Sequence, residues 1–193
     1  KLKMHEKPDV GRVPYGLAVH DHDEEQAVLE VLQNHATIMG NKVKEFENKI
    51  AALFGKKFGI MVNSGSSANL LAFELINLPK DSEIITPILT FSTTLAPILQ
   101  KKLIPVFVDI EPDTYLININ NIEELINKNT KALMIPSLLG NIPDLKQIKK
   151  LAEKHNLIFI EDSCDTLGAT FEDMPTGIYS DISTTSFYGS HII

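Results

Sequence analysis

Residues 145–162 read LKQIKKLAEKHNLIFIED, and this stretch decides the fold class of the chain. Apolar residues recur at helical spacing up to His155, so an amphipathic helix is predicted to end there. The apolar run 157–160 then predicts a short strand, which closes on the adjacent carboxylates Glu161 and Asp162. A helix that leads directly into a short apolar strand is typical of a parallel sheet covered by helices.

The same alternation extends along the rest of the chain. Further helices are predicted over residues 23–34, 42–54, 66–76, 93–100 and 122–126. Further strands are predicted over residues 58–62, 84–86, 104–108, 132–135 and 182–187. We therefore expect an α/β fold of three αβα layers with a mainly parallel sheet, whose ligands bind beyond the carboxyl ends of the strands.

Composition and charge exclude several classes of protein. The 193 residues carry a net charge of −7, which argues against a nucleic-acid or anionic-membrane surface. No apolar run reaches membrane-spanning length and no signal peptide is visible, so a cytoplasmic protein is expected. The single cysteine, Cys164, excludes a disulfide framework or a cysteine-rich metal site. The HDHD run at 20–23 is interpreted as a solvated helix entry, and no metal site is predicted.

Three polar clusters follow predicted strands. Residues 63–69, NSGSSAN, precede a helix; small residues and free helix N–H groups suit a phosphate, although a plain capped turn has the same pattern. Asp162 could pair with a protonated ring nitrogen or simply cap a loop. Residues 186–191, SFYGSH, place a serine and a histidine after the last strand. Phe91 could stack on a flat ring or belong to the core. Taken singly, none of these clusters decides a function.

In this order, the clusters resemble the fold-type I pyridoxal-phosphate enzymes of the DegT/DnrJ/StrS sugar-aminotransferase family. The matching pieces lie at residues 39–40, 46–47, 63–69, 86–87, 90–93, 107–109, 139–141, 161–165, 167–169 and 186–188. The resemblance covers roughly residues 14–193. It implies an N-terminal arm over 1–22 and a cofactor-binding large domain over 23–193, incomplete at its C-terminal end. The C-terminal small domain of the family is expected to be missing from this chain.

The resemblance also implies how the cofactor is held. Ser66 and Ser67 are expected to bind its phosphate, with assistance from Ser186. Phe91 is expected to stack on the pyridine ring, and Asp162 to pair with the pyridine nitrogen. The implied cofactor is pyridoxamine 5′-phosphate or pyridoxal 5′-phosphate.

One position departs from the aminotransferase pattern. His191 stands five residues after Ser186, where the family keeps the lysine that forms the Schiff base, and no lysine follows Lys154. An imidazole has no primary amine, so the cofactor is expected to bind without a covalent link, most naturally as pyridoxamine phosphate. Asp165 is expected on the side of the cofactor's ring hydroxyl, with a less defined role.

The lysine-to-histidine exchange is similar to the nucleotide-sugar 3-dehydratase branch of the family. That branch implies removal of the C3 hydroxyl from an NDP-4-keto-6-deoxyhexose in dideoxysugar or O-antigen (lipopolysaccharide) biosynthesis. His191 would be the general base, because an imidazole changes charge near neutral pH. Two alternatives stay open: a pyridoxal-phosphate-dependent nucleotide-sugar aminotransferase, and a non-catalytic relative that acts as a binding or scaffold protein.

The resemblance implies partners as well. A homodimer is expected, together with a sugar-nucleotide substrate. Either a reductase acting through an iron–sulfur cluster or glutamate as co-substrate would complete the reaction cycle. The sequence does not distinguish CDP from GDP in the substrate.

Overall fold

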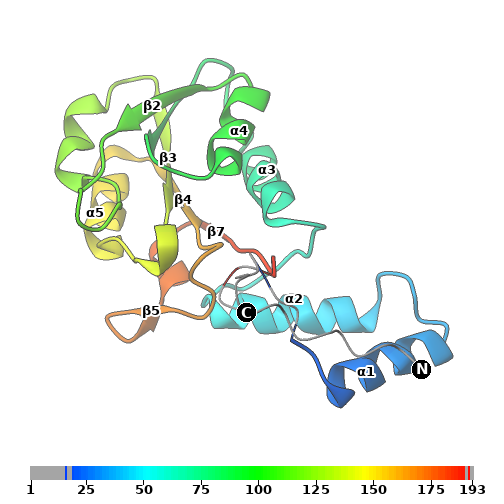
Figure 1. Cartoon of the computed structure of the whole chain (residues 1–193). Helices are drawn as coiled ribbons and strands as arrows, with labels where there is room; N and C mark the ends of the chain where they lie inside the picture. Colours follow the sequence, from blue (N-terminus) through cyan, green and yellow to red (C-terminus); the bar gives the residue numbers. More distant parts are fainter. Residues whose placement is uncertain (1–15, 17–18, 190, 192–193) are drawn as a thin grey trace.

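The computed structural model describes residue 16, residues 19–189 and residue 191. Its centre is a sheet of five strands in the spatial order β2-β1-β3-β4-β7, and each neighbouring pair is parallel (Figure 1). The strands are β1 (Glu83–Pro87), β2 (Ile104–Val108), β3 (Thr130–Pro136), β4 (Ile158–Asp162) and β7 (Ile182–Thr184). Their carboxyl ends share one edge, where the clusters at Asp162 and at residues 186–191 begin.

Helices cover both faces of this sheet. Helices α3 (Gly65–Ile76) and α4 (Ser92–Gln100) lie on one face, and α5 (Leu145–His155) lies on the other (Figure 1). Phe73 of α3 and Ile98 of α4 belong to a fully buried cluster with the first face, and Ile148 of α5 belongs to a second cluster with the opposite face. The predicted three-layer α/β fold is therefore confirmed.

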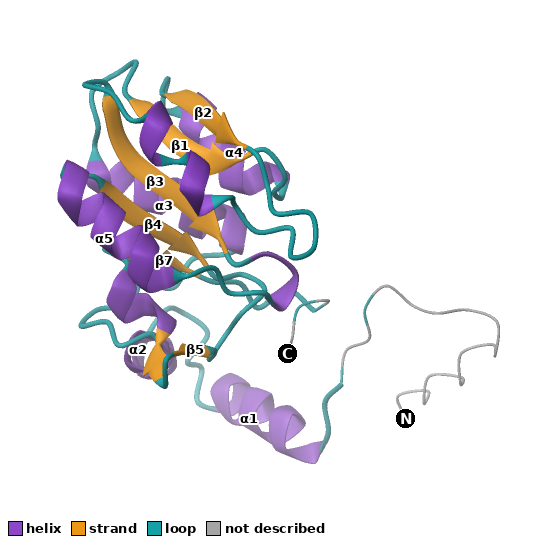
Figure 2. Ribbon diagram, turned by 90° about the vertical axis from the view of Figure 1, so that its left-hand side faces the viewer, coloured by secondary structure: helices purple, strands orange, loops and turns teal. Residues whose placement is uncertain are grey.

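Two N-terminal helices lie outside these layers. Helix α1 (His22–Gln33) begins at a capping box, in which Asp21 accepts the N–H of Asp23 and Glu24 accepts the N–H of Asp21. No residue of α1 is buried, and Figure 2 shows it set apart from the sheet. Helix α2 (Asn41–Leu53) packs closer, with Ala51 buried. The predicted arm over 1–22 lies mostly outside the described residues.

Short elements fill the connections. Strands β5 (Thr170–Phe171) and β6 (Met174–Pro175) pair antiparallel. The described residues also form the 3₁₀ turns η1 (Ile119–Asn121), η2 (Glu123–Leu125), η3 (Leu138–Gly140) and η4 (Thr176–Tyr179). The predicted helix over 122–126 is wrong in type, because the chain there forms the 3₁₀ turn η2. None of the helices in the described part of the chain is long and apolar enough to span a bilayer.

The predicted strand over residues 58–62 is also wrong. This segment forms no ladder with any described strand, and instead follows α2, where the Met61 N–H donates to Glu47 Oε1 over 2.8 Å. Gly59 passes so close that a Cβ there would lie 2.5 Å from the Glu47 carbonyl oxygen. An apolar run favours a strand only where a neighbouring strand can pair with its backbone groups. For a similar reason the strand predicted over 182–187 ends at Thr184, after which the backbone turns into the site.

Candidate active site

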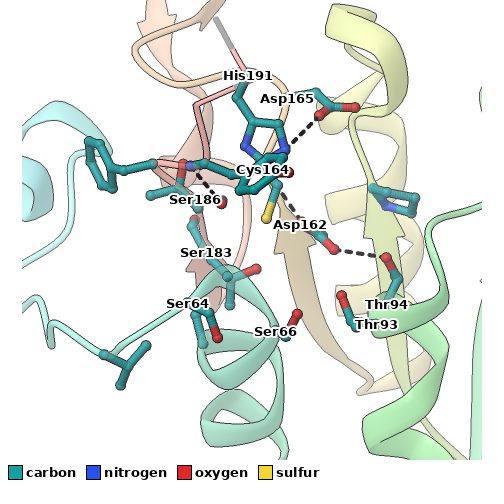
Figure 3. Close-up of a pocket in the computed structure, with 18 of the residues that line it drawn as sticks. Ser64, Ser66, Thr93, Thr94, Asp162, Cys164, Asp165, Ser183, Ser186 and His191 are labelled. Carbon is teal, nitrogen blue, oxygen red and sulfur yellow. Dashed lines mark hydrogen bonds and ion pairs between the residues drawn. The ribbon is translucent and has the colours of Figure 1, made fainter. Parts of the chain in front are cut away.

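A cavity of about 1360 Å³ opens at the carboxyl edge of the sheet (Figure 3). Its walls come from α2, the segment 58–68, the start of α4 and the ends of β3, β4 and β7. Six of the seven predicted site residues line it, namely Ser66, Phe91, Asp162, Asp165, Ser186 and His191. The fold therefore brings together residues that are up to 125 positions apart in the sequence.

The first wall of the cavity is the N-terminus of α3. Ser64 is the N-cap: its Oγ accepts the Ser67 N–H and donates to Ser67 Oγ, both over 3.1 Å. Ser67 is thereby engaged in the cap and does not line the cavity, whereas Ser66 does. Among the described residues, no partner is found for the N–H groups of Gly65 and Ser66. Free N–H groups at the positive end of a helix dipole suit an anion.

Gly65 lets the loop after β7 approach this helix end. A Cβ at Gly65 would lie 2.8 Å from the Ser186 Cβ and 3.0 Å from the Cys164 Sγ. The missing side chain therefore brings the Ser186 hydroxyl beside the start of α3. Cys164 is packed here as well, and burial, with the nearby Asp162 carboxylate, raises the pKa of its thiol.

Asp162 lies at the end of β4 and is almost completely buried. Its Oδ2 accepts hydrogen bonds from Asn69 Nδ2 over 2.8 Å and from Thr94 Oγ1 over 2.9 Å. Its Oδ1 accepts the Cys164 N–H over 3.2 Å. Since an ionised carboxylate can only accept, this set of donors matches the charged form. A charged carboxylate at a cavity wall can pair with a protonated ring nitrogen.

The His191 and Asp165 side chains lie next to each other in the wall of the cavity (Figure 3). His191 Nε2 lies 3.7 Å from Asp165 Oδ1, an ion-pair distance that is too long for a hydrogen bond. The other Asp165 oxygen accepts the Leu139 N–H over 3.0 Å, which fixes the orientation of the carboxylate. The His191 Nδ1 is buried without a hydrogen-bond partner among the described residues. The imidazole is held by its backbone, through the His191 N–H to the Tyr188 carbonyl, and by an edge contact with the Tyr188 ring.

Other cavity residues offer an exposed aromatic ring or hydroxyl groups. Phe91 precedes α4 and leaves 68% of its surface exposed, so its ring is open to a flat ligand. Thr90 Oγ1 and Ser137 Oγ also line the cavity, and both atoms are buried without a hydrogen-bond partner among the described residues. Unpaired buried hydroxyl groups of this kind need a partner, which a bound polar ligand can supply.

A second polar cluster surrounds the neighbouring carboxylate, Glu161, and two of its members, Lys56 and Ser183, also line the cavity. Glu161 is fully buried and accepts hydrogen bonds from the hydroxyl groups of Ser163, Ser180 and Ser183. Lys56 donates to the Ser180 carbonyl over 2.5 Å. Burial lowers the pKa of the Lys56 ammonium group, and the Glu161 and Asp181 charges oppose this shift.

The sequence-based interpretation missed several polar residues around Asp162. Asn69, Thr94 and Thr184 are each buried and hydrogen-bonded to one another or to Asp162. A signal was available for Asn69, because a polar residue inside the apolar face of a predicted helix needs a hydrogen-bond partner. Thr94 and Thr184 gave no such signal, since threonine is common at helix starts and in strands.

Comparisons with known proteins give matches over most of the chain. Residues 19–193 match the model of the DegT/DnrJ/EryC1/StrS aminotransferase family. A dTDP-4-dehydro-2,6-dideoxy-D-glucose 3-dehydratase from Saccharopolyspora spinosa is 37% identical over 184 residues, which are 91% of this chain and 40% of the relative.

Two solved structures are similar in sequence and fold. A GDP-4-keto-6-deoxymannose-3-dehydratase, a histidine-to-asparagine mutant with bound GDP-perosamine, superposes with a TM-score of 0.88 at 35% identity, covering 93% of this chain and 48% of that one. The same kind of enzyme with a trapped PLP–glutamate geminal diamine superposes with a TM-score of 0.80 at 36% identity, covering 84% of this chain and 44% of that one. This chain spans less than half the length of these relatives.

Proposed function

Because the chain belongs to the DegT/DnrJ/EryC1/StrS aminotransferase family, we propose that the protein is a 3-dehydratase of an NDP-4-keto-6-deoxyhexose that depends on pyridoxamine phosphate. Three groups in the cavity support this proposal: an anion-binding helix end, a carboxylate and an imidazole. Two of the relatives that cover most of the chain are named as 3-dehydratases, one of a dTDP-linked and one of a GDP-linked keto sugar. The product would serve dideoxysugar or lipopolysaccharide biosynthesis.

The residues of the cavity fit this cofactor. The free N–H groups at the start of α3, with the Ser66 and Ser186 hydroxyls, would hold its phosphate. Asp162 would pair with the pyridine nitrogen, and Phe91 would stack on the ring. Ser67 would contribute through its cap with Ser64, which fixes the start of α3. When bound, the cofactor supplies an amino group and an electron-withdrawing ring.

One observation carries the choice of a dehydratase over an aminotransferase. Among the described cavity-lining residues the sole lysine is Lys56, and its ammonium group is already directed at the Ser180 carbonyl and hydroxyl. His191 occupies the place where the aminotransferases need an amine, and an imidazole cannot form the covalent link. A non-catalytic scaffold is disfavoured, because the phosphate, ring and nitrogen contacts are all provided for.

His191 and Asp165 would divide the proton transfer between them. His191 Nε2 would accept the proton that leaves C4′ of the cofactor. Asp165, 3.7 Å from that nitrogen, would stabilise the imidazolium that results. Asp162, held by its three donors, would keep the ring nitrogen protonated throughout.

The proposal extends to the partners of the protein. We expect a cytoplasmic homodimer. The trapped PLP–glutamate adduct in a similar enzyme favours glutamate as the co-substrate, with an electron-transferring reductase as the alternative. The nucleotide of the sugar substrate, CDP or GDP, is left open.

The first experiment tests for the covalent link. The protein is incubated with pyridoxal phosphate, reduced with borohydride and digested for peptide mass analysis. We expect no lysine adduct in the wild type and an adduct at position 191 in His191→Lys, which serves as the positive control. An adduct on Lys56 of the wild type would instead support the aminotransferase.

A second variant at the same position tests whether His191 is the general base. His191→Asn is expected to lower the exchange of the C4′ proton of bound pyridoxamine phosphate by about 10²-fold or more. Its affinity for the cofactor should stay within a few-fold of the wild type, because the phosphate and nitrogen contacts are untouched. Unchanged exchange would remove His191 from the reaction.

A further inference from the structure

We infer that Asn69 is a positioning residue, which aims the Asp162 carboxylate at the ring nitrogen of the cofactor and ties it to the phosphate-binding end of α3. This inference rests on the proposed function and extends it to a residue outside the predicted site. Asn69 does not line the cavity, so it would act through Asp162 rather than on the cofactor itself.

The side chain of Asn69 makes three hydrogen bonds from a fully enclosed position. It is 1% exposed. Its Nδ2 donates to Asp162 Oδ2 over 2.8 Å and to the Thr93 carbonyl over 3.1 Å. Its Oδ1 accepts from Thr184 Oγ1 over 2.6 Å. The amide is therefore almost completely satisfied, as a buried amide must be.

These partners leave a single orientation for the amide. Rotating it by half a turn would point its oxygen at the Asp162 carboxylate and the Thr93 carbonyl, which are both acceptors. It would also point its NH₂ group at Thr184, whose hydroxyl would then exchange an acceptor at 2.6 Å for the Glu161 carbonyl at 3.4 Å. Asp162 Oδ2 is thus held against a fixed donor, and the carboxylate cannot rotate without breaking that bond.

Asn69 also sets the spacing between the two ends of the site. It lies one helical turn after Ser66, and a single turn of α3 therefore separates the anion-binding end from the donor to Asp162. Its other contacts reach the start of α4 and strand β7. One side chain thus joins four elements around the cavity, and its length fixes how far the carboxylate lies from the helix end.

The orientation of Asp162 matters for the chemistry because its carboxylate is charged. Within the described part of the chain Asp162 has no ion pair, and its donors are an amide, a hydroxyl and a backbone N–H. Its full negative charge is therefore available to a protonated ring nitrogen. Loss of the Asn69 donor would leave Oδ2 held by Thr94 alone, so that the carboxylate could shift from its aim and the contact would weaken.

The test compares two ligands in the intact protein. Dissociation constants are measured for pyridoxamine 5′-phosphate and for its 1-deaza analogue, in which a C–H group replaces the ring nitrogen. The wild type should bind the natural cofactor more tightly. In Asn69→Leu this preference should fall by about tenfold, because a charge-assisted hydrogen bond depends on the aim of Asp162.

Two variants separate positioning from a general loss of structure. Phe73→Leu disturbs the buried face of the same helix, and should lower the melting temperature while leaving the preference between the two ligands unchanged. Thr184→Val removes the hydroxyl that holds Asn69 Oδ1 but spares the donor to Asp162, so the preference should fall by less than in Asn69→Leu. Asn69→Ser, too short to reach Asp162, repeats the test if the leucine variant does not fold.

The outcomes distinguish this inference from the proposed function. A full preference retained in Asn69→Leu would overturn the positioning role and leave the proposed function intact. Failure of both Asn69 variants to fold, with Phe73→Leu folded, would assign Asn69 a structural role and also overturn the inference. A wild type that binds both ligands equally would show that Asp162 does not meet the ring nitrogen, and the proposed function itself would then fail.

Discussion

The carboxylates of Glu161 and Asp162 are neighbours in β4, yet they lie on opposite faces of the sheet. Asp162 lines the cavity and accepts hydrogen bonds from Asn69, Thr94 and a backbone N–H. Glu161 does not line it, and accepts hydrogen bonds from three serine hydroxyls beside Lys56. The two-residue repeat of a strand is enough to send two equal groups into different surroundings.

The comparison separates chemistry from stability within one dipeptide. The charge of Asp162 faces a space that a ligand can enter, so it can act on that ligand. The charge of Glu161 is surrounded by hydroxyl groups of the chain itself, so it can only hold β4 to the loop and strand that carry Ser180 and Ser183. Substitutions on the Asp162 side should therefore affect mainly the reaction, and substitutions on the Glu161 side mainly the stability.

The largest difference is expected between the carboxylates themselves. Asp162→Asn should lower C4′ proton exchange of bound pyridoxamine phosphate by about 10²-fold, because it removes a fixed charge from the site. Glu161→Ala should lower the free energy of unfolding by about 3–5 kcal/mol, because it leaves three serine hydroxyls without their buried acceptor and removes a charge that favours the Lys56 ammonium group. Exchange kinetics and denaturant unfolding, measured on both variants, check the contrast.

Each variant is the control for the other. Asp162→Asn should lower the free energy of unfolding less, by about 1–3 kcal/mol, because the amide keeps the shape of the carboxylate but turns its NH₂ group toward a donor that the carboxylate accepted. Equal losses of stability in the two variants would break the comparison and make both carboxylates structural.

A smaller difference is expected between two glycines, one on each side. A Cβ at Gly177 would lie 2.3 Å from the Phe54 carbonyl oxygen and 3.0 Å from the Ser183 Oγ, next to the Glu161 cluster. Gly177→Ala should therefore lower the free energy of unfolding by about 1–3 kcal/mol. Gly65→Ala would displace Ser186 instead, and should weaken cofactor binding several-fold with little change in stability. Thermal melts measure the loss of stability, and cofactor titrations measure the loss of binding. A loss of stability in Gly65→Ala but not in Gly177→Ala would contradict the assignment of binding to the Asp162 side and of stability to the Glu161 side.

The smallest expected effect is the contribution of Lys56 to the pH dependence of the free energy of unfolding. Its pKa is lowered in the folded protein, chiefly by burial, so the unfolded chain binds more protons between that value and the ordinary lysine pKa. The free energy of unfolding should therefore rise with pH across this alkaline window. Lys56→Met should lack this rise, as shown by denaturant unfolding at several pH values.

Lys146 provides a control of opposite sign. Its hydrogen bond to Glu172 raises its pKa, so its contribution is present below the ordinary lysine pKa and is lost as the pH rises through the folded value. Lys146→Met should therefore abolish a fall of the free energy of unfolding at alkaline pH, whereas Lys56→Met abolishes a rise. The same pH profile in both variants would show that the Glu161 cluster does not bury Lys56.

The layers of the fold could be predicted because they follow from periodicity. Each described strand of the main sheet coincides with an apolar run, and the helices that cover it begin within about two residues of their predicted starts. The wrong predictions of secondary structure arose where the periodicity of the sequence does not report which element lies next to the segment. Residues 58–62 have a strand-like composition, but in the described structure they meet α2 rather than another strand.

The site could be predicted only in part, for a related reason. Residues at or just after the ends of strands, such as Asp162 and Ser186, are expected at one edge of a parallel sheet, and the structure brings them to one cavity. The roles of the predicted site residues stay predictions. Contacts such as Asn69 to Asp162 or Glu161 to Ser180 join side chains of different elements, and no local pattern in the sequence reports them.

Helix α1 lies apart from the sheet, and this position affects its stability. It is 12 residues long and has no buried residue, although Val28, Leu29 and Leu32 are apolar and exposed. A helix of that length gains little from its own hydrogen bonds in water, and its capping box adds only about 1 kcal/mol. Its amide protons should therefore exchange with solvent far faster than those of α3, whose Phe73 is anchored in the core. Slow exchange in α1 would reveal that another surface covers it in solution.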